Sequence, residues 1–245
     1  MKKIFKKILQ YYLKYITKLV LVIHRPAIIA IAGSTNKTFV KNEINKILKE
    51  EGSSIRLNPK GFNTEVGLPL AILNLSSGYN SYKNWLPVIP EAVLKIFQFN
   101  FPKFLVLELG ISDPGDMKYL LTIIKPKIVV ITDITQRYLE GFNDMDKLVE
   151  EYEYLVKKTD KNGLAILNYD NQRIKEMANI SKVKVKFFGL TDGADWQAVE
   201  IKKGNRGQLI KVKHNNIVSQ YEINKFGQHH VYALLIGLAI KHYLK

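Results

Sequence analysis

Apolar residues along this chain fall into short continuous runs separated by segments of helical periodicity. The run Phe-Leu-Val-Leu at 104–107 lacks the alternation of a half-exposed strand, so both of its faces are expected to be buried. Strands of this kind between amphipathic helices are typical of a parallel sheet covered by helices. The predicted strands are 27–32, 53–57, 104–109, 128–132, 164–167 and 183–188, and the predicted helices are 40–49, 117–123, 145–158 and 171–178.

The C-terminal part of the chain has a different pattern. Segments 196–202, 208–213 and 217–223 are short, alternate in polarity and are separated by polar turns, which predicts a small antiparallel meander. A last helix is predicted from Gln228 to Leu244, and residues 76–95 predict a loop with a short surface helix. The expected fold class is therefore α/β, with a mainly parallel sheet of the type that carries a phosphate-binding loop.

Residues 1–25 predict a basic amphipathic helix that precedes a domain of residues 26–245. No acidic residue occurs before Glu43, and Lys14 and Lys18 interrupt any apolar run of about 20 residues, so this helix is not expected to cross a membrane. Two interpretations remain open. The helix lies in the interface of an anionic membrane, or it packs on the domain with its lysines in water.

The composition restricts the chemistry. The chain of 245 residues has no cysteine, which excludes disulfides and thiolate catalysis and fits a reducing cytoplasm, where we expect the protein, at the inner face of the membrane if its first helix binds there. The net charge of +15 indicates either an anionic partner or only a lysine-rich composition. Because no helix-turn-helix or aromatic–basic pattern accompanies the charge, no specific nucleic acid is expected.

Candidate chemistry begins directly after the first predicted strand. A buried strand, a polar turn ending in Lys-Thr and then a helix is the layout of a loop that cradles phosphates on backbone N–H groups. Glycine is usual before the lysine. Asparagine stands there instead, and it is the next most tolerant residue of a positive φ. The alternative is an ordinary strand-to-helix turn with a Ser/Thr cap. The nucleotide-binding residues expected here are Gly33, Ser34, Thr35, Asn36, Lys37 and Thr38.

Six blocks of sequence, in the right order, resemble the central ATP-binding domain of the Mur ligases. The type that adds D-alanyl-D-alanine to a UDP-N-acetylmuramoyl-tripeptide is the most similar. The resemblance covers about residues 26–245, and any single block would be weak evidence. The blocks are 33–38, 62–70, 106–110 with 113–116, 131–134 with 139–142, 163–170 and 227–230.

The resemblance implies an ATP- and Mg²⁺-dependent ligase of peptidoglycan precursor synthesis, which forms an amide through an acyl phosphate. It implies that Lys37 contacts the β- and γ-phosphates and that Thr38 and Glu108 hold Mg²⁺, with Lys37 and Glu108 as the catalytic residues. Asn63 would line the side of a UDP-muramoyl-peptide-like substrate. Asn168, Asp170 and His229 would lie near the nucleotide.

Departures from the family pattern fall on its chemical positions. Asn36 replaces the loop glycine, Tyr138 a metal-site histidine, Tyr152 the lysine that is carbamylated, and His230 and Ala233 an asparagine pair near adenine. Tyrosine cannot form a carbamate and is a poor ligand for Mg²⁺, so loss of the second metal site is expected. The family's N- and C-terminal domains are also not expected in these 245 residues. The alternative to a ligase is a non-catalytic descendant at the membrane surface, which binds nucleotide weakly or acts as a scaffold.

Overall fold

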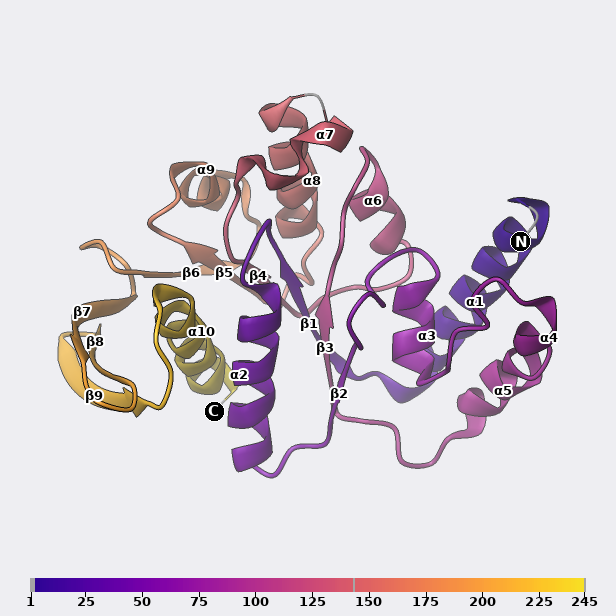
Figure 1. Cartoon of the computed structure of the whole chain (residues 1–245), viewed down its shortest axis with the longest axis horizontal. Coiled ribbons are helices and arrows are strands. Elements are labelled where there is room, and N and C mark those ends of the chain that lie inside the picture. The colour runs from indigo at the N-terminus through magenta and orange to yellow at the C-terminus, as the bar shows by residue number, and fades with distance from the viewer. Residues whose placement is uncertain (1–2, 143, 245) are drawn as a thin grey trace.

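The computed structural model describes residues 3–142 and 144–244, and a single sheet organises them (Figure 1). Within this described part, nine strands follow the order β2-β3-β1-β4-β5-β6-β7-β8-β9. Strands β1 to β7 pair in parallel, and β8 is antiparallel to both of its neighbours. The bounds are β1 Ala27–Ala32, β2 Ile55–Leu57, β3 Phe104–Glu108, β4 Ile128–Ile131, β5 Leu164–Asn168, β6 Lys184–Gly189, β7 Trp196–Lys203, β8 Gln208–His214 and β9 Ile217–Ile223.

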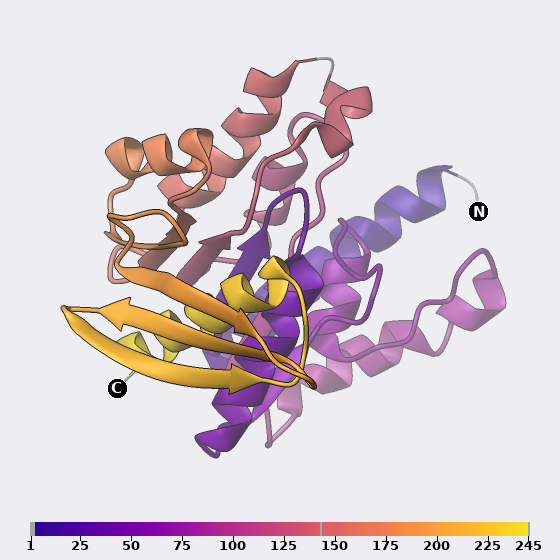
Figure 2. The ribbon, with the colours of Figure 1, turned by 60° about the vertical axis from the view of Figure 1, so that its left-hand side comes forward.

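Helices cover both faces of the parallel strands (Figures 1 and 2). The α-helices are α1 Lys3–His24, α2 Lys37–Glu50, α3 Gly67–Leu73, α4 Tyr82–Trp85, α5 Val88–Leu94, α6 Asp116–Leu120, α7 Leu139–Phe142, α8 Met145–Lys157, α9 Gln172–Glu176 and α10 Gln228–Leu244. The short 3-10 helices in this described part are η1 Lys95–Phe97, η2 Gln136–Tyr138 and η3 Met177–Ile180.

The central strand β1 shows why the apolar runs are continuous. Ile29 and Ile31 point into the cluster under α2 and α10, whereas Ile28 and Ala30 point into the cluster under α6 and α8. Successive strand residues face opposite sides of a sheet, so both sets are buried when helices cover both sides. The parallel α/β architecture predicted from the sequence is confirmed.

The C-terminal strands and helix α3 depart from the predicted pattern. The antiparallel strands β7 to β9 continue the main sheet, because Phe188 and Gly189 of β6 pair in parallel with the start of β7. Helix α3 was not predicted, since it contains a glycine and a proline. Pro69 is its third residue, in the first turn, where a helix tolerates proline because the N–H it lacks needs no partner within the helix.

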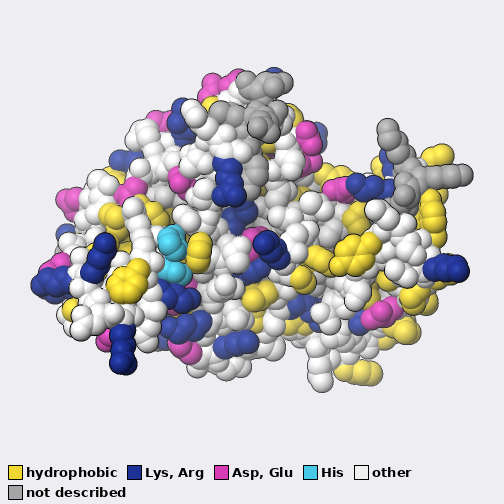
Figure 3. Space-filling view, viewed as in Figure 1, with side chains coloured by type: hydrophobic (Ala, Val, Ile, Leu, Met, Phe, Trp, Pro, Cys, Tyr) yellow, Lys and Arg dark blue, Asp and Glu magenta, His cyan; other side chains and the backbone are white. Residues whose placement is uncertain are grey.

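Helix α1 packs on the domain through one of its faces. Leu9, Leu13 and Val20 are at most 3% exposed and share a hydrophobic cluster with Leu70 and Leu73 of α3. Of the two interpretations left open by the sequence, packing on the domain therefore holds for this inner face of α1. Other apolar side chains stay in solvent, and Figure 3 shows them along the right-hand edge of the molecule, over α1 and the α4–α5 segment. Among the described residues, no helix has the length and apolarity needed to span a bilayer.

The packing of α1 leads to a first prediction. Leu13→Ala should lower the free energy of unfolding by about 2–5 kcal/mol, because it opens a cavity under a fully buried side chain. Leu19→Ala, on the same helix but 45% exposed, should cost less than about 1 kcal/mol. Urea unfolding of both variants measures the difference. Equal losses would show that α1 does not share the core of the domain.

Candidate functional site

The turn between β1 and α2 requires glycine at its first position. Gly33 has φ +134°, and a Cβ atom there would lie 2.2 Å from Oγ1 of Thr132. Any side chain would therefore collide with the end of β4. This close approach explains why the apolar run of β1 ends in glycine and turns toward α2.

Asn36 takes the left-handed conformation expected of it, with φ 65° and ψ 0°. It stands at the N-cap position of α2, yet its side chain makes no capping hydrogen bond to the helix. The first N–H groups of an α-helix have no partner within the helix, and they are commonly satisfied by a cap, by water or by a ligand. The turn thus leaves the positive end of α2 without a side-chain cap.

Hydrogen bonds hold the turn to the carboxyl end of β4. Ser34 N donates to Asp133 O at 2.7 Å, and Thr135 N donates to Ser34 Oγ at 3.0 Å. Thr132 Oγ1 donates to Thr35 O at 2.6 Å. Because β4 neighbours β1 in the sheet, these bonds fix the shape of the turn independently of any ligand.

Lys37 lies over its own turn. Its Nζ donates to Gly33 O. Burial lowers the pKa of Lys37 below its ordinary value, while the nearby Glu108 carboxylate raises it and Arg137 lowers it further. An additional anion would stabilise the protonated form of this lysine, since a nearby negative charge compensates for its lost hydration.

Glu108 and Thr38, the two predicted magnesium ligands, are brought together. Glu108 is the last residue of β3 and pairs in register with Ile31 of β1, whereas Thr38 lies in the first turn of α2. Thr38 Oγ1 donates to Glu108 Oε2 at 3.3 Å. A carboxylate and a hydroxyl are hard oxygen donors of the kind that Mg²⁺ prefers.

The Glu108 carboxylate has a charged partner that sequence reasoning did not identify. That partner is Lys41, whose Nζ lies 2.7 Å from Glu108 Oε1 and 2.7 Å from Asn58 O. The two charged side chains are only 7% and 12% exposed. The available signal was the spacing, because Lys41 follows Thr38 by three residues and shares its helix face.

Asn58 was also missed, and it orients the end of β3. It is 2% exposed, its Oδ1 accepts from Glu108 N at 2.9 Å, and its Nδ2 donates to Glu108 O at 2.9 Å. The same Nδ2 donates to Phe62 O at 3.0 Å. One asparagine therefore holds the backbone of Glu108 on both sides and connects it to the segment that carries Asn63.

Four of the predicted nucleotide residues line one hollow of about 390 Å³. It lies at the carboxyl ends of β4 and β5 and beside the start of α10, the edge where open α/β sheets bind ligands. Most of the lining side chains are polar. The predicted members are Asn36, Asn168, Asp170 and His229, and the others are Asp133, Asn171, Gln228 and Tyr232.

Asp170 already has several donors within the protein. Leu190 N and Tyr232 Oη donate to its Oδ2, both at 2.7 Å, and Thr191 N donates to its Oδ1 at 2.9 Å. Burial would raise the pKa of Asp170, but the hydrogen bonds from Thr191, Leu190 and Tyr232 lower it below its ordinary value. Burial and the Asp170 carboxylate raise the pKa of the Tyr232 phenol. Asp170 is thus an ionised anchor that shapes the hollow.

A second hollow, of about 500 Å³, lies on the other side of the strand ends. Asn63 borders this region, because its O accepts from Gly110 N at 3.0 Å and a Cβ atom on Gly110 would lie 2.5 Å from its Nδ2. Glu65, Asp113 and Asp116 give the lining an acidic character. The predicted nucleotide and substrate residues therefore lie along adjoining parts of one sheet edge.

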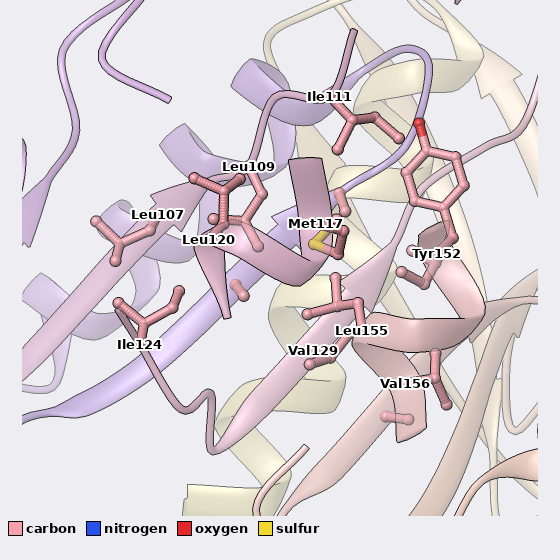
Figure 4. Packing of buried hydrophobic residues seen from close by; sticks show 14 of the residues in the cluster. Leu107, Leu109, Ile111, Met117, Leu120, Ile124, Val129, Tyr152, Leu155 and Val156 are labelled. Atoms are coloured by element: carbon pink, nitrogen blue, oxygen red, sulfur yellow. The ribbon is translucent and has the colours of Figure 1, made fainter. Parts of the chain in front are cut away.

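Two departures from the family pattern are buried in the core. Tyr152 is 1% exposed and lies among Ile111, Met117 and Leu155 (Figure 4), and Ala233 is 2% exposed on α10. The side chain of Tyr138 lies outside the described residues. Among the described residues, no three or more His, Cys, Asp or Glu side chains gather in an arrangement suited to a metal ion.

Comparison with known proteins decides the family. The model of the Mur ligase middle domain matches residues 31–241. The chain belongs to the Mur ligase family. Known Mur ligases include the UDP-N-acetylmuramoyl-tripeptide–D-alanyl-D-alanine ligases of Buchnera aphidicola, 28% identical over 214 residues, and Haemophilus influenzae, 23% identical over 222 residues. The matches cover 87% and 88% of this chain but only 41% and 42% of those enzymes, so the chain spans about two fifths of their length.

Solved Mur ligase structures share the fold. MurF from Acinetobacter baumannii superposes with a TM-score of 0.78 at 18% identity, covering 96% of this chain and 47% of that protein. MurF from Thermotoga maritima, solved in complex with ADP, superposes with a TM-score of 0.78 at 19% identity, covering 96% and 49%. The resemblance drawn from the six sequence blocks is confirmed at the level of family and fold.

The buried ion pair gives a second prediction. Lys41→Met should destabilise the protein by about 3–5 kcal/mol, because it leaves the Glu108 carboxylate buried beside an apolar side chain. Adding Glu108→Gln to this variant should recover part of the loss, since the unpaired charge is then gone. Urea unfolding of the two single variants and the double variant measures the coupling.

A surface pair serves as the control for this cycle. Lys157→Met removes the partner of Glu153, whose Oε2 lies 2.8 Å from Lys157 Nζ on the exposed side of α8, and it should cost less than about 1 kcal/mol. A Lys41→Met variant no less stable than Lys157→Met would contradict the assignment of a buried, tightly coupled pair.

Proposed function

We propose that this chain binds Mg-ATP at residues 33–38 and serves as the nucleotide-binding unit of an amide-forming ligase of the Mur type. One observation carries the proposal. The Thr38 hydroxyl and the Glu108 carboxylate meet at 3.3 Å beside the uncapped start of α2, in a chain that belongs to the Mur ligase family. An anionic ligand with a divalent cation suits both the helix end and the pair of oxygen donors.

We assign proposed roles to the start of α2, to Lys37 and Thr38, and to Glu108. The N–H groups at the start of α2 receive phosphate oxygens, and Lys37 leaves Gly33 O to contact the β- and γ-phosphates. Thr38 and Glu108 would hold a magnesium ion. When bound, Mg²⁺ neutralises phosphate charge that would otherwise oppose transfer. In this role Lys37 and Glu108 are the catalytic residues.

Lys41 has a supporting role in the same proposal. It binds Oε1 of Glu108, which leaves Oε2 on the side of Thr38. The carboxylate therefore keeps one defined orientation without a metal, and burying it costs less because its charge is compensated. We infer that Lys41 and Asn58 are positioning residues for Glu108.

The polar hollow fits the remainder of the nucleotide. Asn36, Asn168 and His229 border it, and Asp170 anchors its wall through bonds to the 190–191 backbone. We propose that it receives the adenosine part of ATP. The hollow beside Asn63 would then receive a UDP-muramoyl-peptide-like substrate, whose carboxylate is activated by ATP and joined to an amine.

A second candidate function rests on the buried departures from the family pattern. Tyr152 and Ala233 fill core positions where the resemblance implies a metal-bridging lysine and an adenine-contacting asparagine. An apolar or phenolic group at these places cannot supply that chemistry. This observation favours a member of the family that binds nucleotide without catalysing ligation.

Nucleotide binding is tested by thermal unfolding. Mg-ATP at about ten times its dissociation constant should raise the midpoint of the wild-type protein by roughly 3–6 °C, because ligand binding stabilises the folded state. Lys37→Ala should abolish this rise, and Asn36→Gly should leave it intact or increase it.

Lys46→Ala is the matched control, since Lys46 lies on α2 with its side chain 62% exposed. It should respond to Mg-ATP as the wild type does. A wild-type midpoint that is unchanged at millimolar Mg-ATP would remove the proposed nucleotide site.

Catalysis is tested separately from binding. If the chain is a ligase unit, incubation with Mg-ATP, UDP-N-acetylmuramoyl-tripeptide and D-alanyl-D-alanine should release ADP and phosphate, and Glu108→Gln should lower the rate by at least about 100-fold. Product formation is followed by chromatography. Thermal stabilisation by Mg-ATP without any substrate-dependent ADP would instead establish the non-catalytic candidate.

A further inference from the structure

Helix α1 carries a second apolar stripe that does not pack on the domain. Its residues follow the helical period, so they form one stripe along the solvent side of the helix. They are 45% to 75% exposed, whereas Leu13 on the inner side is fully buried. The stripe consists of Ile4, Ile8, Tyr11, Tyr15, Leu19 and Val22.

Residues 86–97, which contain α5 and η1, also expose apolar side chains. Tyr12 Oη of α1 donates to Ile89 O of α5 at 2.6 Å, and His24 Nε2 lies 3.2 Å from Ile96 O, so the two segments lie side by side. The segment exposes Leu86, Ile89, Val93, Leu94 and Phe97, each 36% to 71% accessible. We call the α1 stripe and these five residues the outer apolar face. Figure 3 shows hydrophobic side chains along this edge of the molecule.

Basic residues accompany the outer apolar face. Lys7, Lys18 and Arg25 are exposed on or just after α1, and no acidic residue precedes Glu43 in the chain. In residues 79–103 the sequence has one acidic residue, Glu91, and its carboxylate is paired with Lys95 at 3.1 Å. Lys6 of α1 is paired with Glu65 at 2.9 Å, and the remaining basic residues leave this surface with a net positive charge.

We propose that the outer apolar face docks on an anionic lipid surface, with α1 lying in the plane of the interface. Aliphatic and aromatic side chains would enter the boundary between headgroups and acyl chains, and the lysines beside them would meet anionic headgroups. Tyrosine suits this depth because its ring is apolar and its hydroxyl is polar. Charge complementarity favours an anionic lipid surface over a second copy of the chain, because two copies would bring their lysines together.

This docking geometry keeps the sheet edge free. The outer apolar face lies at the β2–β3 side of the molecule, away from β7 to β9 (Figures 1 and 2). The inner face of α1 remains packed in the domain core, so lipid binding needs no release of the helix. The proposal does not depend on nucleotide binding and is tested without nucleotide.

Co-sedimentation with large vesicles tests the proposal. The full chain should sediment with vesicles of phosphatidylcholine and phosphatidylglycerol, should not sediment with phosphatidylcholine alone, and should be released as salt rises. Lys7→Gln combined with Lys18→Gln should weaken the partition coefficient by roughly 30-fold. Ile8→Ser combined with Tyr15→Ser should weaken it at least as strongly, because apolar contact is lost.

Two double variants elsewhere on the surface are matched controls. Lys182→Gln with Lys203→Gln removes the same charge, and Ile217→Ser with Val218→Ser removes exposed apolar side chains of β9. Both should bind as the wild type does. All substituted positions are exposed, and circular dichroism of each variant checks that its fold is intact.

Three results would overturn the proposal. They are no binding to anionic vesicles, equal binding to neutral vesicles, and an equal loss in the control variants. If the wild type binds no lipid but forms dimers that the Ile8→Ser, Tyr15→Ser variant does not form, the face is an interface between two copies and not a lipid surface. Light scattering without vesicles measures this outcome.

Discussion

The buried ion pair between Lys41 and Glu108 is the interaction on which the candidate site depends. A carboxylate at the end of a covered strand is costly unless an opposite charge and hydrogen bonds compensate for its lost hydration. Lys41 supplies that charge from α2, and Asn58, the residue after β2, holds the end of β3. The pair thereby joins the helix that starts at the phosphate loop to the strand that carries the proposed metal ligand, and it leaves the second carboxylate oxygen facing Thr38.

The order of the strands explains why one sheet edge collects the remaining polar groups. Strand β1 lies between β3 and β4, so the turn that follows it is flanked by Glu108 on one side and by Thr132 and Asp133 on the other. Hydrogen bonds between this turn and the β4 end fix its shape without help from a ligand. The same edge continues to β5, where Asn168 donates to Thr132 O at 2.8 Å and joins the polar hollow to the loop.

Helix α1 has one apolar face in the protein core and another that is exposed. Its inner stripe is as buried as the centre of the sheet, and its outer stripe exposes aliphatic and aromatic groups beside lysines. When a helix has two apolar stripes, packing on its own domain buries only one of them, and the other stays exposed to solvent. Part of the positive charge of the chain is therefore concentrated on α1, because the sequence has no acidic residue before Glu43.

The sequence by itself determined the alternation of buried strands and helices and the left-handed asparagine at position 36, because these follow from local periodicity and backbone sterics. The resemblance of six ordered sequence blocks indicated the family. Glu108, at the end of a buried strand, requires a partner for its charge. Only the tertiary structure identified Lys41 as that partner, extended the sheet into β7 to β9, and divided α1 into a packed and an exposed face. The physical reason is that periodicity reveals which faces are apolar, whereas the strand order and the packing of distant segments decide what covers them.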